Sequence, residues 1–275
     1  MSQSYLDANR ANWDERADIH FKNETGFYGI DSVIAGRPVL TSIESAELPP
    51  LAGKRVAHLQ CHIGTDTLSL KLMGAASVTG LDFSTRALEH ARRLAQRAGL
   101  EASFVEGSVY DAPARIGTGY DLVFTSWGTI TWLDDIEAWA RAVAAVLAPG
   151  GQFYFADSHP IAHVFENAPG GGELLLHFDY ETPRERPITF DDDVTYTGST
   201  EKLTSIRTYE WMHSFGQVLN ALIGAGLTID FVHEHASIPW MMFSGMVPAD
   251  EPGMFRLPDG HVRFPLGWSI LAHRR

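Results

Sequence analysis

The chain has 275 residues, a formal net charge of -13, one cysteine and a mean hydropathy of -0.08. This length can bury the core of one large or two small globular domains. The acidic balance argues against a nucleic-acid partner, whose phosphates need clustered Lys and Arg, and a single cysteine excludes an intramolecular disulfide and suits a reducing cytosol. There is no stretch of about 18 apolar residues and no apolar signal core after Met1, so we expect a cytoplasmic protein without a membrane partner.

A short apolar run at residues 56–59 begins a regular alternation of strands and helices. The turn 60–65 leads into a helix over 66–73, and a second apolar strand ends at Asp82. Such a unit is typical of mononucleotide binding, because N–H groups of the turn approach the ligand and the acid accepts hydrogen bonds from a ribose diol. Only Gly64 remains of the glycines in G-x-G-x-x-G, so the prediction depends on the strand–turn–helix context.

The alternation continues to residue 158 and resumes after residue 212. Ser84 caps a helix that Gly99 ends. The later elements are a strand at 102–105, a strand at 122–125, a helix opened by Asp134, a strand at 152–156, a helix at 215–227 and strands at 229–234 and 266–273. This order predicts an α/β fold: a three-layer, doubly wound, mostly parallel sheet.

Two segments lie outside the alternation. Residues 1–48, with a helix over 4–22, are predicted to form an N-terminal cap on the main domain, residues 49–275. Residues 159–212 are predicted to form an inserted, β-rich lid with short strands at 174–180, 193–196 and 205–209. Ligands of open α/β sheets bind outside the carboxyl ends of the strands, so an insertion that leaves this edge is placed to cover the site.

The run 56–65 resembles motif I of class I S-adenosylmethionine-dependent methyltransferases, a strand followed by D/E-x-G-x-G-x-G. His58 stands at the acid of the motif, Gln60 and His62 at its first two glycines, and Gly64 at its last. The later pieces of the family pattern match, in order, at Asp82, Glu106–Asp111, Tyr120–Trp127 and Leu147–Asp157. A subgroup of small-molecule methyltransferases carries the same L-Q-C-H variant.

The resemblance implies a Rossmann-like methyltransferase fold, S-adenosyl-L-methionine as cofactor and a small-molecule acceptor. The residues expected at the cofactor, including three from the cap, are Trp13, His20, Tyr28, Gln60, His62, Gly64, Asp82, Phe83, Ser108, Val109 and Ser126. The acceptor is expected to be a small aromatic or heteroaromatic molecule that is methylated on nitrogen or oxygen.

A neutral imidazole suits removal of a proton from the acceptor. The candidates are His213, His159 and His163, with His213 first because a helix start lowers the pKa of a histidine. Aromatic rings can stack on a flat acceptor, and their faces attract the positively charged sulfonium. The candidates for this role are Trp127, Trp211 and Trp240. Trp132 and Trp139 are expected in the core.

Other functions remain open at this point. The acceptor nucleophile could be a carboxylate, a thiol or another small group, and the protein could bind a nucleotide or other ligand without catalysis. A nicotinamide-dependent oxidoreductase would use the same unit, but the chain has no Tyr-x-x-x-Lys pair. We expect no metal site, because His58, Cys61 and His62 lie on a strand and its turn and no second ligand pair has suitable spacing. A monomer or a homodimer is expected.

Overall fold

The computed structural model describes residues 3–275. The strands of its central sheet are β1 (Arg55–Leu59), β2 (Ser77–Asp82), β3 (Ser103–Glu106), β4 (Tyr120–Ser126), β5 (Leu147–Ser158), β10 (Leu227–His235) and β14 (Gly267–Arg274). Their order is β10-β14-β5-β4-β1-β2-β3; β1 to β5 are parallel, and β14 is antiparallel to β5 and β10. The order reverses between β1 and β4, so their carboxyl ends form the switch point at which such sheets bind ligands.

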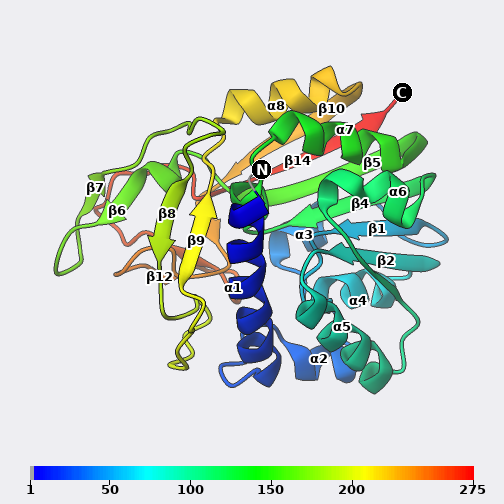
Figure 1. Cartoon of the computed structure of the whole chain (residues 1–275), viewed down its shortest axis with the longest axis horizontal. Coiled ribbons are helices and arrows are strands. Elements are labelled where there is room, and N and C mark those ends of the chain that lie inside the picture. Colours follow the sequence, from blue (N-terminus) through cyan, green and yellow to red (C-terminus); the bar gives the residue numbers. More distant parts are fainter. Residues whose placement is uncertain (1–2) are drawn as a thin grey trace.

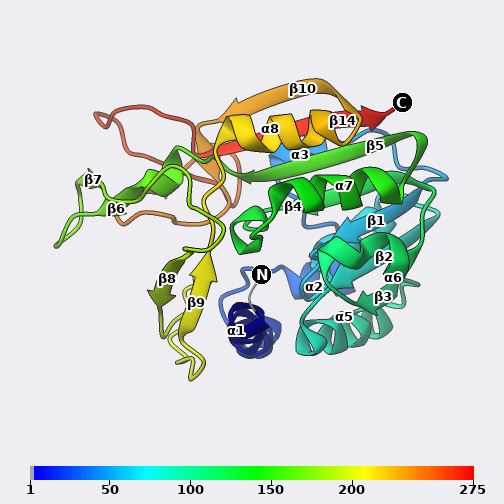
Figure 2. The same cartoon turned by 45° about the horizontal axis from the view of Figure 1, so that its top comes forward.

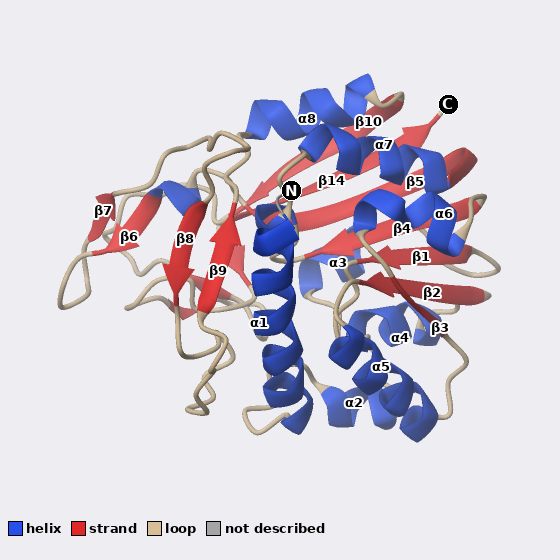
Figure 3. Cartoon of the chain, in the orientation of Figure 1, coloured by secondary structure: helices blue, strands red, loops and turns tan. Residues whose placement is uncertain are grey.

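Helices cover both faces of this sheet (Figures 1 and 3). α4 (Thr65–Leu72) and α5 (Thr85–Ala98) lie on one face, and α6 (Ala112–Ile116), α7 (Ile136–Val146) and α8 (Phe215–Gly224) lie on the other. α5 shows why these segments are helical: Ser84 Oγ accepts the Ala87 N–H at 3.0 Å, Gly99 ends the helix with φ 65°, and its alanines and leucines are buried. The predicted three-layer, mostly parallel architecture is confirmed.

Three helices precede the sheet: α1 (Gln3–Lys22), α2 (Ile30–Ile34) and α3 (Ser42–Glu47). Ile30 and Val33 of α2 pack in one apolar cluster with α4 and α5. α1 stands between α5 and the predicted lid at the edge where β1, β4 and β5 end (Figure 2). None of the described helices combines the length and the apolar character that crossing a bilayer requires.

Residues 159–212, hereafter the lid, contain two hairpins. β6 (Phe165–Asn167) pairs with β7 (Leu174–Leu176), and β8 (Ile188–Asp191) pairs with β9 (Arg207–Glu210). The strand expected at 193–196 is wrong, because these residues form bends and a turn, and β6 and β8 were not predicted. Both hairpins project beyond the carboxyl edge of the sheet (Figure 1).

A second excursion, between β10 and β14, was not predicted. Its strands β11 (Ser237–Ile238), β12 (Val247–Pro248) and β13 (Phe255–Arg256) form a small antiparallel sheet. Buried side chains of this excursion share a core with the start of the lid, and the members of that core include Ala162, Phe165, Ile238, Trp240, Phe243 and Leu266. The lid therefore rests on a second chain segment.

Three predicted boundaries are wrong by a few residues, and the first is that of β5, which begins at Leu147 and not at residue 152. α7 begins at Ile136 and is capped by Asp135, whose Oδ1 accepts the Ala138 N–H at 2.8 Å, so Asp134 does not open the helix. α8 ends at Gly224, and Leu227 already belongs to β10.

Candidate active site

The loop after β1 has a left-handed backbone at three alternate residues. Gln60, His62 and Gly64 have φ values of 60°, 48° and 79°. Glycine adopts this conformation readily, whereas a residue with a side chain is strained there by about 1–3 kcal/mol. Gln60 and His62 stand at the first two glycines of motif I, so the backbone keeps the shape of the motif although two glycines are missing.

Gly64 is required by packing. A Cβ at this position would lie 2.9 Å from Ala91 Cβ and 2.9 Å from the ring of Phe104. Helix α5 and strand β3 therefore approach the loop too closely for a side chain. The contact of Gly64 with a cofactor stays a prediction.

Asp82 ends β2 and holds the loop through its carboxylate. Oδ2 accepts the backbone N–H of His62 at 2.8 Å, and Oδ1 accepts the backbone N–H of Ser84 at 2.9 Å. Burial raises the pKa of Asp82 to about 6, although these N–H groups favour the ionised form. Each carboxylate oxygen has two lone pairs, so both can also accept from a ligand.

A cavity of about 300 Å³ lies beside Asp82, at the carboxyl ends of β2 and β3. This volume is at the lower end of the range for small-molecule sites. Five of the predicted cofactor residues line it: Gln60, Asp82, Phe83, Ser108 and Val109. The remaining wall comes from α1, the turn after β4, the start of α7 and the lid, through residues that include Asn9, Trp132, Asp135 and Arg184.

Gln60, which lines this cavity, has a buried amide oxygen without a partner among the described residues. Its Nε2 donates to the Thr129 carbonyl at 2.8 Å, whereas its buried Oε1 has no hydrogen-bond partner among the described residues. A buried amide oxygen without a donor costs about 1–3 kcal/mol unless a ligand or water supplies an N–H or O–H group.

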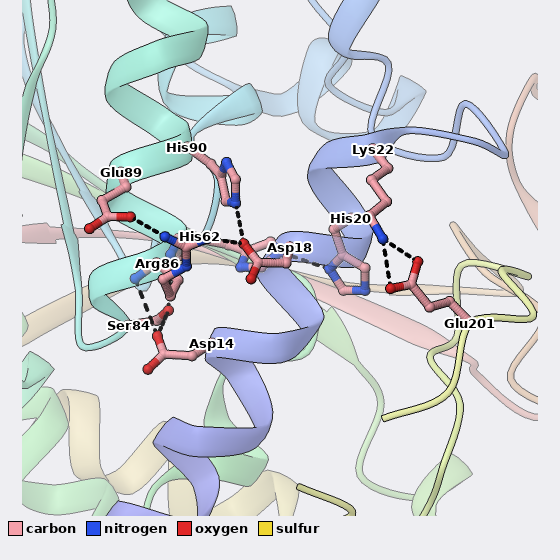
Figure 4. Close-up of polar contacts among 11 residues, drawn as sticks. Asp14, Asp18, His20, Lys22, His62, Ser84, Arg86, Glu89, His90 and Glu201 are labelled. Atoms are coloured by element: carbon pink, nitrogen blue, oxygen red, sulfur yellow. Dashed lines mark hydrogen bonds and ion pairs between the residues drawn. The ribbon is translucent and has the colours of Figure 1, made fainter. Parts of the chain in front are cut away.

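Helix α1 is fixed to α5 on one side and to the lid on the other (Figure 4). Asp14 accepts from Ser84 Oγ at 2.6 Å, and Asp18 accepts from His90 Nε2 at 2.6 Å. On the opposite side, Lys22 forms an ion pair with Glu201. α1 thus links the sheet domain to the lid.

Four residues predicted at the cofactor form an aromatic cluster under α1. His20 Nδ1 lies 2.8 Å from His62 Nε2, and the His20 ring lies 4.9 Å from the ring of Tyr28. The Trp13 ring lies 5.2 Å from His62 and 5.2 Å from Trp132, which lines the cavity. Burial lowers the pKa of His62 to about 3, so this imidazole is neutral near pH 7. The cluster adjoins the cavity, and its contact with a cofactor stays a prediction.

Arg16 brings a buried positive charge to this cluster. The residue is 7% exposed, its Nε donates to Asn12 Oδ1 at 2.6 Å, and its guanidinium lies over the rings of Trp13 and Tyr196. Among residues 3–275 it forms no ion pair with a carboxylate. Burial raises the pKa of the Glu210 carboxyl to about 7 and the charge of Arg16 opposes this shift, so Arg16 acts on a buried carboxyl group of the lid.

The turn after β4 is organised by Asp157, the penultimate residue of β5. Its fully buried carboxylate accepts the backbone N–H groups of Gly128 at 2.6 Å and Thr129 at 2.9 Å. Trp127, which precedes them, has a φ of 45°, a strained value for an aromatic residue. The turn is therefore held in one shape, and the Trp127 ring meets Trp240 edge-on at 6.1 Å.

Two carboxyl groups also reach the end of β4. Asp66 Oδ2 accepts from Ser126 Oγ at 3.2 Å, and Glu44 Oε1 accepts from Trp127 Nε1 at 2.9 Å. Burial and the proximity of Asp66 raise the pKa of Glu44 to about 7, and burial raises that of Asp66 to about 6. Ser126 was predicted at the cofactor; Asp66 and Glu44 were not singled out.

His213 and His163 line the same small cavity of about 10 Å³, together with Ser158. His213 Nε2 donates to the Leu133 carbonyl at 2.7 Å, which leaves Nδ1 as the atom that can take a proton. Burial lowers the pKa of His213. His213 lies directly before Ser214, the cap residue of α8, as predicted, and a contribution of the helix to its pKa stays a prediction.

The other predicted acceptor residues lie apart from this cavity. His159 packs on Phe215 and lies 3.0 Å from Glu234. Trp211 is 1% exposed, and its indole N–H donates to the Arg184 carbonyl at 2.9 Å, so the described contacts give it a structural task in the lid. Acceptor contacts of Trp127, Trp211 and Trp240 stay predictions.

Sequence reasoning missed several cavity residues. Trp132 was assigned to the core, but it is half-buried and lines the cavity, whereas Trp139 is fully buried as expected. Asn9 and Arg184 were not singled out. Only the polar residues at helical spacing in α1 gave a signal for Asn9, and nothing local to residue 184 indicated its partners.

Comparison with known proteins agrees with the fold. Residues 56–151 match the family model described as a methyltransferase domain. The chain is similar to the S-adenosylmethionine-dependent methyltransferase from Mesorhizobium loti, with 22% identity, a TM-score of 0.57 and coverage of 84% of this chain and 96% of that one. A second solved structure, from Clostridium acetobutylicum, has 14% identity and a TM-score of 0.52 over 94% of each chain.

Among curated proteins, the chain is 32% identical over 128 residues to a ubiquinone biosynthesis O-methyltransferase of Ralstonia nicotianae. This match covers 46% of this chain and 53% of the relative, and a Klebsiella pneumoniae protein of the same name gives 32% over 126 residues. The chain thus spans about half the length of the curated relatives it matches. The sheet, its switch point and these similarities together establish the methyltransferase fold for this chain.

Proposed function

We propose that this chain transfers a methyl group from S-adenosyl-L-methionine to nitrogen or oxygen of a small aromatic or heteroaromatic molecule. The observation that carries the proposal is the cavity at Asp82, bounded by a loop that keeps the motif I backbone. The relatives named O-methyltransferases support oxygen as the methylated atom. The family match ends at residue 151, before the lid. The proposed class of acceptor therefore depends on lid residues that lie outside this match.

The residues present fit this cofactor. Asp82 would accept from the ribose hydroxyls, and Ser108 and Val109 would lie along the base. The methionine portion would lie beside Gln60, which lines the cavity after the end of β1. When bound, the cofactor supplies a methyl group activated by a sulfonium.

The chain's own contribution is alignment, exclusion of water and removal of a proton. The turn 130–133 contributes to both cavities, through Trp132 and Leu133 to the large one and through Ile130 and Thr131 to the small one. His213 would take the acceptor proton at Nδ1, because its Nε2 proton is committed to the Leu133 carbonyl. His163, whose Nε2 lies 2.6 Å from Ser158 Oγ, is the second candidate.

Two measurements test the function. Calorimetry with S-adenosylmethionine, its demethylated product S-adenosylhomocysteine and NAD should show binding of the first two only. A screen of phenols, catechols and aromatic amines should then release S-adenosylhomocysteine, and His213→Ala should lower turnover by about 10²–10⁴ while cofactor affinity is kept. Binding of NAD alone, or no turnover with any acceptor class, would reject the proposal.

A further inference from the structure

One lid residue reaches the wall of the large cavity. The Arg184 side chain lines the cavity beside Asp135 and is also 52% exposed to solvent. A side chain that borders the cavity and solvent at once lies at the boundary between them. The lid therefore closes part of the cavity that contains Asp82.

Arg184 is held at this boundary by two carboxylates on the sheet domain. Its Nε donates to Asp134 Oδ2 at 2.8 Å, and its Nη1 donates to Asp135 Oδ2 at 3.0 Å. The Asp134 side chain has no exposed surface, and its Oδ1 accepts from Tyr110 Oη at 2.8 Å. Asp135 is fixed as the cap of α7. Both acceptors are thus positioned by contacts within the sheet domain as well as by Arg184.

Hydrogen bonds within the lid hold the backbone around Arg184 in place. The Arg184 carbonyl accepts from Trp211 Nε1, and Thr182 exchanges hydrogen bonds with Met212 at 3.0 Å and 2.9 Å. The Trp211 backbone N–H donates to the Thr131 carbonyl at 2.7 Å. The base of the lid is therefore anchored, and the Arg184 ion pairs join its edge to the start of α7, while Asn9 of α1 exchanges two hydrogen bonds with Tyr209 on the other side of the cavity, each at 2.8 Å.

We propose that Arg184 is a latch, a side chain that holds the lid closed over the large cavity beside Asp82. Entry and exit of the cofactor then both require its ion pairs with Asp134 and Asp135 to open. The inference rests on the proposed function for the identity of the ligand. The lid then controls entry and exit of the cofactor in addition to binding the acceptor. Because the guanidinium binds protein carboxylates, its loss should lower a barrier and leave the affinity of the closed site almost unchanged.

The test is stopped-flow binding of S-adenosylhomocysteine, a ligand without a transferable methyl group, followed by the tryptophan fluorescence of the chain, to which Trp132 in the cavity wall contributes. Arg184→Gln should raise both the association and the dissociation rate by roughly three- to tenfold, the range expected for partly exposed ion pairs, with Kd changed less than about threefold. Salt should raise both rates of the wild type, because it screens the latch, and should affect the variant less.

Two matched variants sharpen the result. Arg207→Gln removes a bidentate ion pair with Asp191 on the same lid, away from the cavity, and should leave both rates unchanged. Asp135→Asn keeps an oxygen for the α7 cap and removes one partner of Arg184, so it should give an intermediate increase.

Unchanged rates in Arg184→Gln would overturn the latch. So would a faster dissociation alone with Kd weakened by the same factor, because Arg184 would then be a ligand contact. If the wild type binds no S-adenosylhomocysteine, the proposed function and the latch fail together; if it binds and only the latch predictions fail, the proposed function stands.

Discussion

Residues 55–158 and the segments that cover them, α1 and the lid, are held together by different interactions. In the first region, apolar side chains from the sheet and its helices form continuous cores. In the second, polar side chains of α1 are buried against the lid: Asn12 Nδ2 donates to the Ser205 carbonyl at 2.7 Å, across 193 residues of sequence. Glu15 accepts from the hydroxyls of Thr204 and Ser205, each at 2.6 Å.

This difference has a consequence for binding. A close-packed apolar core resists local opening, whereas a polar contact can exchange its partners with water at a small net cost. The sheet domain should therefore hold the cavity beside Asp82 in one shape, whereas α1 and the lid should open locally at a lower cost. The following variants test this division.

The largest effect is expected inside the sheet domain, at Asp157. Asp157→Ala removes the acceptor of the Gly128 and Thr129 N–H groups and leaves buried donors unpaired, which should lower the free energy of unfolding by about 3–5 kcal/mol. Urea denaturation at pH 7 measures it. Asp193→Ala, which removes an exposed ion pair with Lys202, should change stability by less than about 0.5 kcal/mol. If Asp157→Ala lost less than about 1 kcal/mol of unfolding free energy, these hydrogen bonds would not be important for the stability of the sheet domain.

Gly64→Ala should cost about 2–4 kcal/mol, because a left-handed residue acquires a Cβ that also collides with Ala91 and Phe104. Gly99→Ala is the matched control: its φ is 65° but nothing lies within 4 Å, so it isolates the backbone term. Equal losses of unfolding free energy in the two variants would show that the close approach to Gly64 has no energetic importance.

A smaller effect is expected between α1 and the lid. Glu15→Gln should weaken this contact by about 1–2 kcal/mol, with faster hydrogen exchange confined to the lid near Thr204 and Ser205. Glu201→Gln removes only the exposed ion pair with Lys22 and should have little effect. Faster exchange throughout the sheet domain in Glu15→Gln would contradict the division into two regions.

The same variant has a pH signature. Burial would raise the pKa of Glu15, but hydrogen bonds from Ser205 and Thr204 lower it from 4.5 to about 2. A carboxylate with a lowered folded pKa stabilises the protein above its unfolded pKa, and this contribution is lost as pH falls through the folded value. The stability difference between Glu15→Gln and the wild type should therefore be largest above pH 4.5 and shrink toward pH 2.

Local patterns in the sequence predicted the sheet domain because its determinants are local. The strand ending at Asp82, the cap at Ser84 and the stop at Gly99 each depend on a few neighbouring residues, and all three are confirmed. Five predicted cofactor residues line one cavity because strand ends of a parallel sheet meet at one edge.

α1 and the lid could not be predicted in the same way, because contacts between residues far apart in the sequence determine how they pack. Arg184 lies in a Pro-rich turn, and its partner Asp134 is 50 residues earlier in the chain. α1 buries Asn9, Asn12, Arg16 and His20, so its inward face has no apolar periodicity to recognise. Likewise, the two-residue strands of the β10–β14 connection are too short to show an alternating pattern.

We propose that Asp82 binds the cofactor ribose in its ionised form. Burial raises its pKa from 3.8 to about 6, and hydroxyl donors would favour the carboxylate, so below pH 6 a proton must leave before the ligand binds. Calorimetry of S-adenosylhomocysteine from pH 5 to pH 8 should show constant affinity above about pH 6.5 and weaker affinity below pH 6, by up to about tenfold per pH unit. Asp82→Asn should bind roughly tenfold or more weakly at pH 8 and lose this pH dependence. If Asp82→Asn bound S-adenosylhomocysteine at pH 8 with the affinity of the wild type, Asp82 would not be the ribose ligand.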